Sequence, residues 1–278
     1  MQLPRGFGLL GRVALGIRRP RRPILGTELS GEVETVGAGV TTFGVGDAVL
    51  AFPGARMGAH AEYCCIPAAG PVARKPVNLT YEQAAALSFG GATVLDFFRR
   101  ASLQRGERVL VNGASGAVGT AAVQLARHFG AVVTGVCSTA NLALVESIGA
   151  DEVIDYTKVD FTRTGRKYDV IVDAAGTAPF SRSGQVLAPG GRLLLILADL
   201  APMIQAPWIT LTTTANVIVG PAAERPEYVQ ALCRMAAAGA FTPVIDRIYP
   251  FEQMHEAHRH VDTGRKRGSV VVRMEPDA

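Results

Sequence analysis

The sequence has few cysteines, and none of them is spaced for a disulfide framework or a four-cysteine zinc site. Cys64 and Cys65 are adjacent, Cys137 and Cys233 are isolated, and no C-x-x-C pair occurs. If the adjacent pair lies on a strand, its side chains point to opposite faces of the sheet. Because unpaired thiols are typical of a reducing compartment, we expect a cytoplasmic protein.

Long apolar runs and a strong charge of one sign are also missing. No run reaches the roughly 20 apolar residues that a membrane-spanning helix needs, and the net charge is only +4 over 278 residues. We therefore expect neither a membrane nor a nucleic-acid partner. The first 27 residues contain six arginines and no acid, which resembles a transit peptide. Since those arginines lead directly into a folded pattern, we assign them no targeting role.

What the sequence does contain, at residues 108–129, is a strand, a glycine turn and a helix in that order. The turn Ala114-Ser115-Gly116-Ala117-Val118-Gly119 fits G-x-G-x-x-G, with alanine in the first glycine position. Glycines let the backbone approach a pyrophosphate, and a helix N-terminus offers free N–H groups. We predict that residues 115–119 (Ser115, Gly116, Ala117, Val118 and Gly119) bind a dinucleotide. The alternative is an ordinary strand–turn–helix corner.

Strands and helices alternate along the rest of the chain from residue 131. Apolar strands are expected at residues 131–137, 152–155, 168–173, 192–197 and 216–219, which predicts a parallel sheet covered by helices on both faces. Before the glycine turn, a capping box at Thr80 and Gln83 predicts a helix over 81–88 that ends at Gly90-Gly91, followed by a second helix over 93–101. The still earlier segments LSGEVETVG, DAVLAF and AHAEYCCIP predict antiparallel strands of a small barrel.

Several motifs occur together in a fixed order: ILGTELSGEVETVG, GAHAEY, VLVNGASGAVG, LVESIGADEVIDY, YDVIVDAAG and LAPGGRLL. From about residue 18 to residue 274 the chain resembles the zinc-independent quinone oxidoreductase branch of the medium-chain dehydrogenase/reductase superfamily. The resemblance implies an α/β fold, with a Rossmann doubly wound parallel sheet and a partial GroES-like β-barrel. It places the catalytic domain at residues 1–88, the cofactor domain at 89–241 and a return to the catalytic domain at 242–278.

The same resemblance implies an enzyme that transfers hydride from NADPH to a small molecule, either a quinone or an activated enone or carbonyl compound. The resemblance is compatible with a homodimer but does not decide the oligomeric state. It also implies an opening segment that precedes the residues present here. We expect that the lack of this segment opens the substrate cleft on one side and exposes a sheet edge.

The residues expected at a zinc site do not suit zinc. Zinc-dependent members of the superfamily carry Gly-His-Glu, whereas this chain has Gly26-Thr27-Glu28, and a threonine hydroxyl cannot replace an imidazole ligand. The histidines at 255, 258 and 260 lack the i, i+4 spacing that places two imidazoles on one face of a helix. We therefore predict no metal.

The end of the second expected strand favours NADPH over NADH. An NAD site usually has an acid there, whereas residues 137–141 contain no acid and offer hydroxyl and amide donors. The resemblance implies these further contacts: Ser138 and Tyr156 with the adenosine phosphate, Thr93 near the nicotinamide, Gly176 and Leu197 along the cofactor cleft, and Arg267 near the phosphates. Many relatives have an arginine where this chain has Ala140, which weakens the preference. The alternative for Tyr156 is a packed aromatic at a strand end.

No catalytic residue can be assigned from the sequence. Reduction of an enone or a quinone leaves charge on oxygen, which needs a proton or a hydrogen-bond donor. His60 and Tyr63 titrate, but both lie in the expected barrel strand and are interpreted as structural. Water or a ribose hydroxyl of the cofactor would then supply the proton.

A second hypothesis comes from a different class of function. With an incomplete substrate domain, the chain would be a catalytically impaired protein that binds the cofactor or a partner. A short-chain dehydrogenase fits poorly, because none of the six tyrosines has a lysine four residues later. A methyltransferase that uses S-adenosylmethionine would need an acid where Cys137 lies.

Overall fold

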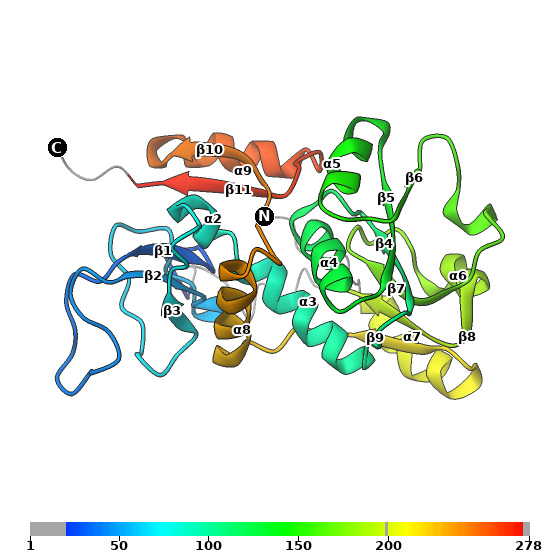
Figure 1. The fold of residues 1–278 in the computed structure, drawn as a ribbon, viewed down its shortest axis with the longest axis horizontal. Coiled ribbons are helices and arrows are strands. Elements are labelled where there is room, and N and C mark those ends of the chain that lie inside the picture. The colour runs from blue at the N-terminus through cyan, green and yellow to red at the C-terminus, as the bar shows by residue number, and fades with distance from the viewer. Residues whose placement is uncertain (1–20, 198–199, 275–278) are drawn as a thin grey trace. The chain divides into compact units, whose positions relative to one another are not determined.

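The computed structural model describes residues 21–197 and 200–274, which form two compact units (Figure 1). The first unit is Thr93–Ala222, and the second combines residues 21–92 with 223–274. The sequence placed the domain boundaries after residues 88 and 241, whereas here helix α8 (Pro226–Ala237) belongs to the second unit. It packs against strand β3 (Val72–Arg74), and the Asn78 side-chain amide donates to the Ala236 carbonyl at 2.8 Å.

The first unit is built on a six-stranded parallel sheet. Its strands are β4 (Arg108–Asn112), β5 (Val132–Cys137), β6 (Glu152–Asp155), β7 (Tyr168–Asp173), β8 (Leu187–Leu195) and β9 (Asn216–Val219). They lie in the order β6-β5-β4-β7-β8-β9, and every neighbouring pair is parallel. This is the doubly wound Rossmann order, whose direction reverses between β4 and β7.

The central strands are apolar on both faces, as the sequence predicts, and Val109, Leu110 and Ile171 are fully buried. Helices α4 (Ala117–His128) and α5 (Leu142–Ser147) pack on β4, β5 and β6, and α7 (Leu200–Thr212) packs on β9. The short α6 (Phe180–Ser183) precedes β8. The predicted α/β fold of this unit is confirmed.

Two elements of this unit differ from the prediction. Helix α7 was not predicted, and it contains Pro207, a residue that normally interrupts helices. Strand β8 begins at Leu187 rather than at residue 192. Its pairing with β7 shifts register between Tyr168 and Val170, so the predicted turn Pro189-Gly190-Gly191 is an irregularity within the strand.

The second unit contains two small sheets. Strands β1 (Leu29–Glu32), β2 (Ala48–Ala51) and β3 are antiparallel, whereas β10 (Ile245–Pro250) and β11 (Ser269–Arg273) are parallel and are connected by α9 (Met254–Asp262). The predicted strand at residues 59–67 is wrong. Ala59 and His60 donate their N–H groups to the carbonyls of Gly26 and Leu25, at 3.2 and 2.8 Å, so the start of this segment pairs with irregular chain instead of a strand.

The predicted capping box is confirmed, but the helix boundaries after it differ from the prediction. The Gln83 N–H donates to Thr80 Oγ1 at 3.2 Å, and the Thr80 N–H donates to Gln83 Oε1 at 3.0 Å. Helix α2 is Tyr81–Ala85, and α3 is Ser88–Ala101, so Gly90 and Gly91 lie inside a helix. A Cβ at Gly91 would lie 2.6 Å from Leu232 Cδ2, so this glycine is needed for close packing of α8.

Candidate functional site

The turn between β4 and α4 has the backbone geometry of a dinucleotide site. Gly113 follows β4 at a φ of 81°, a left-handed conformation that favours glycine. Gly116 is the N-cap of α4 and has an extended backbone without a side-chain cap. The first N–H groups of α4 have no partner within the helix and are therefore free to bind an anion.

Gly116 and Gly119 serve this turn in different ways. A Cβ at Gly119 would lie 2.0 Å from the carbonyl oxygen of Gly113 and 2.8 Å from Ala114 Cα, so only glycine allows α4 to pack this closely on the end of β4. A Cβ at Gly116 would lie 3.6 Å from the same oxygen, which is an ordinary contact. Gly116 therefore leaves room for a ligand, and Gly119 sets the position of the helix.

Asn141 joins Ser115 of the turn to Ser138 at the end of β5. Its Nδ2 donates to Ser115 Oγ at 3.0 Å and to Ser138 Oγ at 3.2 Å. Its Oδ1 is buried and has no hydrogen-bond partner among the described residues. Since buried polar atoms are normally paired, this acceptor fits a donor from a ligand, such as a ribose hydroxyl.

The sequence reasoning missed an acid beside this cluster. Asp155, the last residue of β6, accepts a hydrogen bond from Thr139 Oγ1 at 2.5 Å and one from Thr157 Oγ1 at 2.7 Å. The Thr139 bond and then the Thr157 bond lower the pKa of Asp155, so the carboxylate stays charged at neutral pH. The neighbouring Tyr156 is 60% exposed and its N–H donates to the Cys137 carbonyl, which contradicts the alternative of a packed aromatic.

A buried acid organises the point where the strand order reverses. Asp173, at the end of β7, accepts from Asn112 Nδ2 at 2.8 Å and from the Ala178 N–H at 2.8 Å, and Asn112 Nδ2 also donates to Thr177 Oγ1 at 2.9 Å. These bonds hold the loop after β7 against the end of β4. In a doubly wound sheet, ligands bind at this edge. The sequence signal that could have revealed this network is an acid, Asp173, at the end of an apolar strand.

The other predicted residues are distributed as follows. Gly176, at a φ of 70°, lies against Leu197, whose carbonyl oxygen would be 3.4 Å from a Cβ at that glycine. Thr93 is nearly buried in α3 and makes no hydrogen bond to the other predicted residues. Arg267 belongs to the second unit, where it lines a pocket. The residues from the glycine turn to Asn141 fit a dinucleotide, because they combine close backbone, free N–H groups and an unpaired acceptor.

The segment Gly26-Thr27-Glu28 serves a structural purpose in the second unit. Glu28 Oε2 accepts the Phe89 N–H at 2.7 Å and so caps the start of α3. Burial raises the pKa of Glu28 to about 7, although the N–H groups of Phe89 and Ser88 and the charge of Lys266 lower it. Among the described residues, no group of three His, Cys, Asp or Glu side chains is placed to hold a metal ion.

His60 and Tyr63 lie in the segment that is not a strand. The ring of His60 meets that of His258 edge-on, with centroids 6.1 Å apart, and burial and then His258 lower the pKa of His60. Tyr63 is 71% exposed. Neither residue hydrogen-bonds to a predicted cofactor residue, so the structure adds no reason to assign either one a catalytic role. Over the two described ranges, no helix is both long and apolar enough to span a membrane.

Comparison with known proteins identifies the family. A family model described as alcohol dehydrogenase GroES-like domain matches residues 9–77, and one described as zinc-binding dehydrogenase matches residues 148–272. A 2-methylene-furan-3-one reductase of Solanum lycopersicum is 32% identical over 92% of this chain, and the chain covers 65% of that relative's length. A chloroplast envelope quinone oxidoreductase homolog of Arabidopsis thaliana is 31% identical over 94% of this chain and 84% of its own length.

Solved structures agree with this result. A quinone oxidoreductase of Pseudomonas syringae superimposes with a TM-score of 0.74 at 28% identity, over 89% of this chain and 81% of that one. The relatives, both family models and the strand order all indicate the same family. The chain belongs to the quinone oxidoreductase branch of the medium-chain dehydrogenase/reductase superfamily.

Proposed function

We propose that this chain is a reductase that transfers hydride from NADPH to a quinone or to an activated enone or carbonyl compound. The observation that best supports a dinucleotide cofactor is the glycine turn, which Asn141 connects by hydrogen bonds to the end of β5. The substrate class is supported by the relatives' names, which are a furanone reductase and a quinone oxidoreductase homolog. The furanone and the quinone in these names are conjugated carbonyl compounds, which accept hydride.

The chain's own residues would bind and orient the dinucleotide. The N–H groups at the start of α4 would hold the pyrophosphate, and the Asn141 Oδ1 would accept from a ribose hydroxyl. When bound, the cofactor supplies the hydride and becomes oxidised, and the reduced oxygen gains a proton from water or a ribose hydroxyl. No side chain is assigned to that proton transfer.

The preference for NADPH over NADH is proposed to be weak. The hydroxyl of Ser138 and the exposed Tyr156 are suitable donors to a 2′-phosphate, and Ala140 provides no cation. The charged carboxylate of Asp155 lies beside Thr139 and opposes a second anion nearby. The affinities for NADPH and NADH should therefore differ less at this site, which has donors, one acid and no arginine, than at a site that contains a guanidinium.

We propose that the reaction needs no zinc. Thr27 replaces the histidine that zinc-dependent members use, and Glu28 is occupied in capping α3. Hydride acceptance by a conjugated carbonyl group requires only a hydrogen-bond donor at oxygen.

A homodimer and a cytoplasmic location complete the proposal. On α7, the side chains of Ile204, Trp208 and Leu211 are 69%, 72% and 82% exposed and recur at helical spacing. Such an apolar stripe favours burial against a second copy. The four cysteines are free thiols, which suits a reducing compartment. Light scattering should give a dimer mass that Trp208→Glu reduces to the monomer.

The experiment that tests the function separates binding from turnover. Titration calorimetry with NADPH and with NADH measures binding, and NADPH oxidation with menadione and with but-3-en-2-one measures reduction. We expect binding together with turnover of at least one acceptor. Binding without turnover would favour the second hypothesis, a non-catalytic cofactor-binding protein, and absence of binding would refute the cofactor site.

A further inference from the structure

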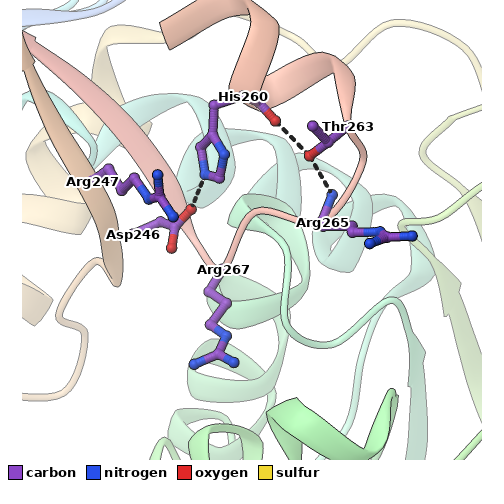
Figure 2. A pocket seen from close by; sticks show the side chains of 6 residues that line it. All are labelled: Asp246, Arg247, His260, Thr263, Arg265 and Arg267. Carbon is purple, nitrogen blue, oxygen red and sulfur yellow. Dashed lines mark hydrogen bonds and ion pairs between the residues drawn. The ribbon is translucent and has the colours of Figure 1, made fainter. Parts of the chain in front are cut away.

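The second unit contains two adjacent cysteines that the proposed reductase function does not use. Cys64 and Cys65 are both free thiols and follow one another directly in the segment 59–67. Cys64 is partly buried, and Cys65 is exposed. Neither of them lines the pocket that contains Arg267 (Figure 2), so the pair is not part of the phosphate contact predicted for that arginine.

The backbone of this segment does not hold the two thiols apart. In a strand, neighbouring side chains point to opposite faces of the sheet. Residues 59–67 do not form a strand, and from Ala61 to Ile66 no backbone group forms a hydrogen bond with another backbone group in the described ranges. The dihedral angles around the two cysteines are therefore not fixed by a sheet, and both sulfurs can turn toward one ligand.

The two sulfurs have different surroundings, and they interact. A Cβ at Gly58 would lie 3.8 Å from Cys64 Sγ, an ordinary contact, so this sulfur packs beside the glycine. Burial and then the charge of Cys65 raise the pKa of the Cys64 thiol. The two sulfurs therefore lie within electrostatic range of each other, and one of them is packed in place while the other is open to solvent.

Two ordinary roles of cysteine do not explain the pair. A partly buried cysteine acts as a small apolar residue, which accounts for Cys64 but not for the exposed Cys65. A catalytic nucleophile needs a lowered pKa, whereas the pKa of Cys64 is raised. A role as paired ligands uses both sulfurs.

A direct disulfide between the two cysteines is unfavourable. Their peptide bond is trans. Consecutive Cα atoms across a trans bond are about 3.8 Å apart, whereas the Cα atoms of a disulfide are usually about 4.4–6.8 Å apart. A bound ion lengthens the bridge: with metal–sulfur bonds of about 2.3 Å, as in zinc thiolates, it joins sulfurs up to about 4.6 Å apart, against about 2.05 Å in a disulfide.

The number and the softness of the donors select the ion. Thiolates are soft ligands that favour Cu(I), zinc and iron–sulfur clusters. Structural zinc and iron–sulfur clusters need four protein ligands. In the part of the chain that the structure describes, no group of even three His, Cys, Asp or Glu side chains is placed to hold a metal ion. Cu(I) has a filled d shell and is stable with two thiolates, so it is the ion that fits an isolated pair.

We propose that Cys64 and Cys65 together bind one monovalent copper ion through their two sulfurs. Binding displaces the thiol protons and leaves the oxidation states of copper and sulfur unchanged. The site lies within the second unit and goes beyond the reductase function. The prediction of no metal rests on ligands for zinc and does not extend to a site of two sulfurs.

The test is an anaerobic titration of the full chain with Cu(I), in competition with the chelator bicinchoninate and with ascorbate as the reductant. The variants are Cys64→Ser and Cys65→Ser, each of which removes one sulfur at nearly constant volume. The matched control is Cys233→Ser, which removes an isolated, partly buried thiol of α8 in the same unit. We expect one Cu(I) per chain, bound at least tenfold more weakly in each of the two variants and with unchanged affinity in the control.

Two further measurements make the result specific. Circular dichroism checks that each variant is folded, and Cys65→Ala repeats the substitution at the exposed position, where folding does not depend on the side chain. X-ray absorption at the copper edge should show two sulfur neighbours and no nitrogen.

The proposal is overturned if the chain does not bind Cu(I) against the chelator, if Cys233→Ser loses as much affinity as the two variants, or if only one of the adjacent cysteines matters. A nitrogen neighbour of copper would also overturn it, because the ion would then be bound by histidine. NADPH binding should be the same in Cys65→Ser as in the unchanged protein, so failure of the copper site and failure of the reductase function are distinguishable.

Discussion

Substitution of two glycines of the same turn should weaken cofactor binding in both cases but lower stability in only one. Gly119→Ala places a Cβ 2.0 Å from the Gly113 oxygen, about 1.4 Å short of the 3.4 Å at which ordinary contacts begin. The three nearest atoms, the Gly113 carbonyl oxygen and carbon and Ala114 Cα, all belong to backbone, so α4 itself must move away from β4. Overpacking of this kind costs about 1–3 kcal/mol. The gain from replacing a helical glycine by alanine, about 0.5–1 kcal/mol, offsets only part of this.

Gly116→Ser provides the matched comparison. A Cβ at Gly116 has space, at 3.6 Å from the same oxygen, and the φ of −80° is open to any residue. Serine is also a good N-cap, so the free energy of unfolding should change by less than about 0.5 kcal/mol. Its side chain would nevertheless occupy the space that the pyrophosphate needs.

The assay combines urea unfolding of the free protein, followed by circular dichroism, with calorimetry of NADPH binding. Gly119→Ala should lower both stability and affinity, whereas Gly116→Ser should weaken NADPH binding at least tenfold at unchanged stability. The reasoning is refuted if Gly119→Ala unfolds and binds like the unchanged protein. It is also refuted if Gly116→Ser binds NADPH with undiminished affinity, since the pyrophosphate would then lie elsewhere.

Three further predictions concern charge and metal. The pKa of Glu28 is raised to about 7 in the folded state, so the unfolded chain loses this proton first and the free energy of unfolding falls between pH 4.5 and pH 7, by up to about 3 kcal/mol. Urea unfolding across this range should show that the free energy of unfolding changes less steeply with pH in Glu28→Gln. An identical dependence on pH would contradict the assignment. Ala140→Arg places a guanidinium in the exposed turn after β5 and should raise the preference for NADPH over NADH about tenfold, measured as the ratio of dissociation constants; an unchanged ratio would mean that the 2′-phosphate lies elsewhere. Elemental analysis should find no stoichiometric zinc, and chelators should leave activity intact; one zinc per chain would refute the zinc-free proposal.

The sequence by itself determined the elements whose signal is local. The apolar run at residues 109–111, followed by the glycine spacing at 116 and 119 and then by a helical period, predicted a buried strand, a turn and a helix in that order. The capping box at Thr80 and Gln83 is likewise a contact between residues three apart. These features depend on near neighbours in the chain, so periodicity and residue type suffice to predict them.

Only the tertiary structure decided the features that depend on distant residues. Gly91 lies inside α3, where Leu232 of α8 packs against it. Residues 59–67 do not form a strand, and the N–H groups of Ala59 and His60 donate instead to the carbonyls of Gly26 and Leu25. Asp155 reaches Thr139 only because β5 and β6 are adjacent in the sheet. The register of β10 shifts between Ile245 and Arg247, which no local pattern reveals, because the shift is defined by pairing with β11.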